Sequence, residues 1–265
     1  MTIAMTAPRS TLNLTRMWHD APAFTGLAML MTLAMVPLLA AMALDDRLFQ
    51  GESVWLKPLK FHLALVIYLI TLAFYARFMP PTGRLWRAFV AAVCLAVLGE
   101  ILWIGGAAAN QTASHFNITN PVMSTLYGLM GFFAVLLTSA SLVMGLSIAR
   151  NPSVAPTLRL SLALGLITTF VLTVIVAGYM SSNLSHFIGT STRTLPIMGW
   201  SRDAGDLRVA HFFATHALHA VPLVGLAASR MTLPQGRATV IAATAAYSAF
   251  VLALFVQALA GRPFL

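Results

Sequence analysis

Ionisable side chains gather in the stretch from Asp206 to His219, inside an otherwise apolar segment. Asp206 and Arg208 come first, followed by His211, His216 and His219. At about 100° per residue, Arg208, His211 and His219 fall roughly on one helical face. His216 and His219 are one turn apart and could share an ion with a ligand from another helix. His211 and His216, about 140° apart, could not easily do so.

Further candidates come from other parts of the chain. Glu100 is the only carboxylate well inside an apolar segment. It is predicted either as a ligand or general base, or as the structural partner of Lys60, Arg208 or a backbone donor. The candidate catalytic residues are Glu100, Asp206 and Arg208, and the candidate metal ligands are His115, His211 and His216. Lys60, as an anion contact, and Trp200, as part of a cover, are the candidate substrate contacts.

The elements that position these residues must cross a membrane. Of the 265 residues, 59% are hydrophobic and only 9% are charged, whereas soluble domains carry about 25% charged residues. The mean hydropathy is +0.84. The net charge of +9 comes from single basic residues between apolar runs. These form no dense basic patch with aromatics, so a nucleic-acid partner is excluded and the lipid bilayer is the expected environment.

Seven apolar segments reach the roughly 20 residues that a bilayer-crossing helix needs. They are predicted at 21–44, 56–79, 86–110, 121–149, 158–181, 207–229 and 238–259. Pro156 is assigned to the break after the fourth segment, and Pro234, Gln235 and Gly236 to the break after the sixth. The prediction is an all-α, integral membrane helical bundle that forms one domain over residues 1–265.

The distribution of charge predicts an orientation. Side X is the side of the N-terminus and side Y is the opposite side. Nine of the sixteen Lys and Arg residues belong to side X, whereas six of the seven acids belong to side Y. Cytoplasmic loops carry an excess of Lys and Arg. We therefore expect side X, with the N-terminus, to be cytoplasmic in a multi-pass membrane protein.

Polar chemistry is expected on side Y alone. That half of the chain contains six of the seven histidines: His62, His115, His186, His211, His216 and His219. A channel needs a polar lining throughout, and a transporter needs a midplane site with access to both faces. A polar pocket open to one side is more typical of an enzyme, a cofactor site or a receptor for a small molecule.

Three functions remain open from the residues alone. The first is a metal-dependent enzyme that uses zinc, copper or manganese on a lipophilic or periplasmic substrate. The second is a b-type haem protein in electron transfer, with His62 and His211 as axial ligands from two helices. The third is a sensor or transporter in which clustered histidines respond to a small molecule or to protons.

Four stretches resemble a family of bacterial polytopic membrane proteins that has no established activity. They are WLKPLKF (55–61), TASHFN (112–117), GWS (199–201) and GDLRVAHFFATHALHAVPL (205–223). The resemblance implies a membrane fold and a site made of Lys57, Lys60, Glu100, His115 and the run from Asp206 to His216. His62 and His219 are less typical of the family.

Overall fold

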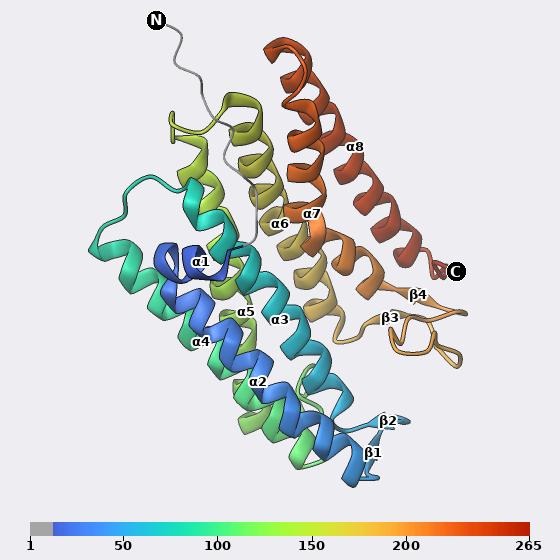
Figure 1. The fold of residues 1–265 in the computed structure, drawn as a ribbon. Coiled ribbons are helices and arrows are strands. Elements are labelled where there is room, and N and C mark those ends of the chain that lie inside the picture. The colour runs from blue at the N-terminus through green and yellow to red at the C-terminus, as the bar shows by residue number, and fades with distance from the viewer. Residues whose placement is uncertain (1–12) are drawn as a thin grey trace, which may run out of the picture.

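The computed structural model describes residues 13–265 and is almost entirely helical (Figure 1). Within these residues seven helices are long and apolar enough to cross a membrane, which confirms the predicted helical bundle. They are α2 (Pro22–Leu44), α3 (Leu56–Tyr75, followed by the 3-10 turn η1, Ala76–Phe78), α4 (Arg84–Ala109), α5 (Pro121–Ala149), α6 (Pro156–Asn183), α7 (Leu207–Ala228) and α8 (Leu233–Leu259). Because successive helices reverse direction, α2 begins on side X and α8 ends on side Y. The cytoplasmic assignment of side X stays a prediction, and Arg9 lies outside the described residues.

Proline and asparagine set several helix starts. Asn120 caps α5, where its Oδ1 accepts a hydrogen bond from the Met123 amide at 3.0 Å. Pro156 begins α6, and Pro234 lies in the first turn of α8. The prediction that Pro156 and Pro234 belong to the breaks was therefore wrong. A first-turn amide has no partner within the helix, so proline fits there without loss and its fixed φ favours the start.

A short helix that the sequence analysis did not predict precedes the first span. α1 (Leu14–Asp20) begins at Asn13, whose side chain accepts from the Arg16 amide. Met17 is buried in the bundle, whereas Leu14 and Trp18 are exposed. α1 therefore has the character of an interfacial helix at the side X end of α2, with apolar side chains available to the bilayer surface.

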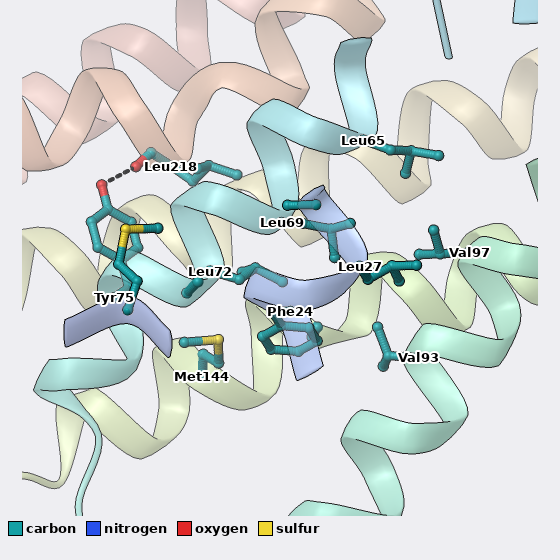
Figure 2. Close-up of a cluster of buried hydrophobic side chains, with 14 of the residues drawn as sticks. Phe24, Leu27, Leu65, Leu69, Leu72, Tyr75, Val93, Val97, Met144 and Leu218 are labelled. Carbon is teal, nitrogen blue, oxygen red and sulfur yellow. Dashed lines mark hydrogen bonds between the residues drawn. The ribbon is translucent and has the colours of Figure 1, made fainter. Parts of the chain in front are cut away.

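The core of the bundle joins α2, α3, α4 and α5 (Figure 2). Its buried side chains include Phe24, Leu69, Leu72, Val93 and Met144. The Tyr75 hydroxyl of α3 donates to the Leu218 carbonyl of α7 at 2.7 Å, so the core is also tied to the second half of the chain. A hydroxyl in this position needs a protein partner because the bilayer core offers no water.

Small residues allow α6 and α7 to approach closely. A Cβ at Gly165 would lie 2.8 Å from Pro222 Cδ, and a Cβ at Gly225 would overlap the side chain of Ser161. Small residues are typical of helix contacts in membranes. The hydrophobic effect does not drive helices together in lipid, so close van der Waals packing must hold them in contact. This interface fixes the depth and rotation of α7, which carries most of the candidate site residues.

Two short hairpins close side Y, at the lower right of Figure 1. β1 (Leu48–Phe49) pairs with β2 (Glu52–Ser53) just before α3. β3 (Phe187–Ile188) pairs with β4 (Gly205–Asp206) just before α7. The hairpins therefore hold the side Y ends of α3 and α7, where Lys57 and Arg208 begin the candidate site.

Candidate functional site

Asp206 fixes the position of Arg208 at the start of α7. The carboxylate is completely buried, whereas the Arg208 side chain is 28% exposed. Oδ1 of Asp206 accepts from the backbone N and Nε of Arg208, both at 3.0 Å. Oδ2 accepts from Arg208 Nη2 at 2.7 Å and from the Ser201 amide at 2.9 Å. With its lone pairs used in this way, Asp206 is a positioning residue for the guanidinium.

The loop at Gly199 brings cations of α3 and α7 to one place. Arg208 Nη2 also donates to the Gly199 carbonyl. A Cβ at Gly199 would lie 3.5 Å from Arg208 Nη1 and 3.8 Å from Lys60 Nζ. Gly199 has a φ of 71°, which favours glycine. Lys60 Nζ is itself 3.7 Å from Glu52 Oε2 of β2.

Two loop histidines complete the assembly from other segments. Burial lowers the pKa of His115 well below its ordinary value, and the nearby charges of Lys57, His186 and His211 lower it further. Burial also lowers the pKa of His186 to about 3, helped by Arg208 and Lys57 and opposed by Asp206. Hence both imidazoles are neutral at pH 7 beside two cations. We call Lys57, His115, His186, Asp206, Arg208 and His211 the side Y cluster.

Acidification is expected to destabilise the fold through His186. Its pKa is about 6.5 when unfolded and about 3 when folded. The contribution of neutral His186 to the free energy of unfolding is therefore fully present above pH 6.5. It is lost as the pH drops toward 3, by up to about 1.4 kcal/mol per pH unit. Thermal unfolding of detergent-purified protein between pH 7.5 and 4.5 measures this slope.

The slope should be shallower in His186→Asn than in the wild type, because the substituted side chain does not titrate. The exposed His19 provides the control, and His19→Asn should keep the wild-type slope. Equal slopes for wild type and His186→Asn would contradict the assignment.

Glu100 is within electrostatic reach of Lys57 but forms no ion pair with the partners proposed from the sequence. The residue is 4% exposed, and its Oε1 has no hydrogen-bond partner. Lys57 is the cation whose charge acts on it. Lys60 pairs with Glu52 and Arg208 pairs with Asp206. The proposed pairing of Glu100 with Lys60 or Arg208 was therefore wrong, because each of those cations has an acid close to it in sequence or on the adjoining hairpin.

The structure does not support the predicted metal centre. Among residues 13–265, no group of three or more His, Cys, Asp or Glu side chains could hold a metal ion. His115 and His211 are electrostatic neighbours. His216 instead bonds the Phe212 carbonyl at 2.6 Å and faces His219, with ring centroids 5.4 Å apart. The proposed ligands are therefore divided between two places along α7.

The proposed haem pair is not favoured by the helix geometry. His62 is 4% exposed, and its Nδ1 bonds the Pro58 carbonyl at 2.8 Å. Thr71 of α3 contacts α7, because its hydroxyl bonds His219. His62 is nine residues before Thr71, so it lies on the opposite side of α3, about 180° around the helix axis. His62 therefore shares the core face of α3 with Leu69, whereas His211 belongs to the side Y cluster.

Trp200 lies next to Gly199 at the edge of this assembly. Its ring packs edge-on against Phe212 and Phe264, with centroids 5.5 and 5.9 Å away. This packing places an apolar wall beside Lys60 and Arg208. The role of Trp200 and Lys60 as substrate contacts stays a prediction.

Two residues near the site were not among the candidates from the sequence. His186 precedes β3 in the long connection between α6 and α7, and Glu52 lies on β2. The one-sided distribution of histidines was the signal that could have found His186. Nothing local marks Glu52, because its contact with Lys60 depends on the β1–β2 turn.

Two cavities are lined by residues outside the side Y cluster, and the first adjoins it through the β3–β4 pairing next to Asp206. One, of about 330 Å³, is lined by residues including Ile188, Asp203 and Ala260. The other, of about 340 Å³, lies at side X beside Pro80 and Trp86. Neither contains a candidate site residue. The side Y cluster offers two cations, Lys57 and Arg208, that a small anionic group could join.

Comparison with known proteins assigns no family. No family model, no curated protein and no solved structure matches the chain. The function must therefore be argued from the side chains themselves.

Proposed function

We propose that this multi-pass membrane protein binds the anionic headgroup of a lipophilic molecule at the side Y cluster. One observation carries the proposal. The charges of Lys57 and Arg208 repel, and Glu100 offsets this only from a distance, because among the described residues no carboxylate lies within 4.0 Å of Lys57. A phosphate or carboxylate between the two cations would relieve this repulsion.

The neighbouring groups favour an anion in the same place. Nε and Nη2 of Arg208 donate to Asp206, whereas Nη1 donates to no other residue in the described part of the chain. The neutral imidazoles of His115 and His186 can donate or accept a hydrogen bond without adding charge. Lys57 and Arg208 therefore supply the charge, and the imidazoles supply the directional contacts.

The location of the cluster favours a lipophilic ligand. Lys57 and Arg208 are each the second residue of their helix, at the side Y boundary of the membrane. If a headgroup binds at this depth, the alkyl chain attached to it would lie in the membrane against the apolar surfaces of the helices. The excess of Lys and Arg at side X supports a cytoplasmic side X. With the resemblance to bacterial membrane proteins, side Y would then face the periplasm from a bacterial inner membrane.

A second candidate is an enzyme that acts on the bound molecule. The observation that favours it is Glu100, a buried carboxyl beside Lys57 with one unpartnered oxygen. A carboxyl in such a position can take or give a proton when a ligand arrives. An enzyme would convert the bound amphiphile, so mass analysis of the ligand after incubation separates this candidate from binding alone.

Dodecyl phosphate is the probe that tests the proposal. Isothermal titration of the detergent-purified protein should show saturable binding, with weaker binding of inorganic phosphate and none of dodecanol. Lys57→Gln should weaken dodecyl phosphate binding about 10- to 100-fold, the effect of losing one charge-assisted contact. Arg202→Gln is the matched control, because Arg202 is an exposed cation on the same side.

Four results would contradict the proposal in whole or in part. Equal affinity of dodecanol would show that the alkyl chain alone binds. An unchanged affinity in Lys57→Gln would move the site elsewhere. Equal losses of affinity in Lys57→Gln and Arg202→Gln would indicate that the positive charge of the side Y surface attracts the ligand, without a specific site. Tighter binding of inorganic phosphate than of dodecyl phosphate would identify a free anion as the ligand and overturn the lipophilic part.

A further inference from the structure

Three histidines of α7 form a column that runs from the side Y cluster into the membrane. These residues, His211, His216 and His219, are called the histidine column. His219 is twelve residues beyond Leu207, or about 18 Å along the helix, which places it near the middle of the span. His211 is at the outer end and belongs to the side Y cluster. The column therefore connects the site with the membrane interior.

Hydrogen-bond partners fix which nitrogen carries the proton in the two inner rings. His216 Nδ1 lies 2.6 Å from the Phe212 carbonyl, which can only accept, so Nδ1 is the protonated nitrogen. His219 Nε2 lies 2.9 Å from Thr71 Oγ1. The Thr71 hydroxyl already donates to the Ile67 carbonyl at 2.7 Å, so His219 Nε2 must be the donor. In the neutral rings the lone pairs are therefore on His216 Nε2 and His219 Nδ1.

Within residues 13–265, neither of these two nitrogens has a hydrogen-bond partner. Among the described residues, the buried atoms without a hydrogen bond include Nδ1 of His219 and Nδ1 of His211. The ring centroids of His216 and His219 are 5.4 Å apart. His211 precedes His216 by five residues, about 7.5 Å along the axis and about 140° around it, so the two rings do not meet directly. A buried acceptor without a partner is costly, and such atoms in a membrane usually mark a functional path.

Apart from arginines at the side X ends of the helices, such as Arg159 of α6 and Arg237 of α8, the charged groups on the elements around the column are at its outer end. α3 contributes Lys57 there and the uncharged Thr71 at the inner end. α4 contributes Glu100, and the adjoining loops contribute His115 and His186. α6 contributes Thr173, whose buried hydroxyl has no partner, and α8 contributes Tyr247, bonded to the Phe213 carbonyl. From Val209 to Ala228, α7 has no ionisable residue except the column.

We propose that the histidine column is a proton path that opens at side Y and ends at His219. A proton enters from the aqueous side Y and reaches His216 Nε2 from His211 through one or more water molecules. The imidazolium of His216 then transfers that proton to Nδ1 of His219 and becomes neutral again. The path ends there because the proton of the Thr71 hydroxyl is committed to the Ile67 carbonyl.

A pH jump on proteoliposomes tests this path without any ligand. Solid-supported membrane electrophysiology records the charge that enters the membrane when the external pH is lowered. The wild type should give a transient current and no sustained current, because the path ends near the middle of the bilayer. His216→Gln and His219→Gln should each reduce the displaced charge about fivefold or more. His62→Gln is the matched control, because His62 is buried in α3 and away from the column.

Nitrogen-15 NMR of histidine-labelled wild-type protein in bilayers provides a test that does not depend on folded variants. His219 should be protonated at Nε2 when neutral, and lowering the pH should add the second proton at Nδ1. The proposal is overturned by an undiminished transient in both column variants, by no transient in the wild type, or by a sustained wild-type current. An Nδ1-protonated neutral His219 would overturn it as well.

Discussion

Replacing Asp206 with alanine is expected to be the most damaging single change at the site, with a loss of about 3–5 kcal/mol. The substitution would remove four hydrogen bonds, three of them from Arg208. It would leave the Arg208 guanidinium largely buried without its counter-ion and remove the cap of α7. Denaturant unfolding in detergent micelles measures the loss.

Asp46→Ala is the control for this prediction. Asp46 is an exposed aspartate on the same side of the membrane and has no hydrogen bond or salt bridge within the described chain. Its replacement should change stability by less than about 0.5 kcal/mol. A loss for Asp206→Ala no larger than that for Asp46→Ala would refute the role of Asp206 in positioning Arg208.

Gly225→Ala is expected to separate α6 from α7 and to cost about 1–3 kcal/mol. The added methyl group would overlap both the Oγ and the Cβ of Ser161. Neither helix can move freely, because Gly165 packs against Pro222 about one turn away on the same interface. The thermal unfolding temperature and the yield of monodisperse protein measure the effect.

A second substitution tests the cause of this loss. Ser161→Gly removes both atoms that the new methyl group would meet, so the double variant should recover much of the stability lost by Gly225→Ala. Gly178→Ala in α6 is the control, because a Cβ there meets nothing within 4 Å. No recovery in the double variant, or an equal loss in Gly178→Ala, would show that the helices are not in contact at this point.

The membrane spans could be predicted because length and hydropathy decide them locally. The fourth span was predicted at its observed bounds, 121–149, since Asn120 and Pro121 mark its start in the sequence. α8 was predicted to begin at residue 238 but begins at Leu233. Pro234 acts as a helix breaker or a helix starter according to its neighbours, so composition alone could not place that boundary.

The candidate site was predictable only along single helices. The grouping of Asp206, Arg208 and His211 follows from their spacing at the start of α7. That Glu100 lies beside Lys57, and Lys60 beside Glu52, depends on the rotation of α3 and on the β1–β2 turn. The spacing of His216 and His219 allowed their rings to meet, as they do. The hydrogen bond between His219 and Thr71 could not be predicted, because it depends on the position of α3.

The most direct test of the proposed anion site is an experimental structure of the protein with dodecyl phosphate bound. The proposal predicts phosphate density within hydrogen-bond distance of Lys57 Nζ and Arg208 Nη1, with the alkyl chain directed toward the membrane. Density in the side X cavity beside Pro80 and Trp86, with the side Y cluster empty at saturating ligand, would contradict it.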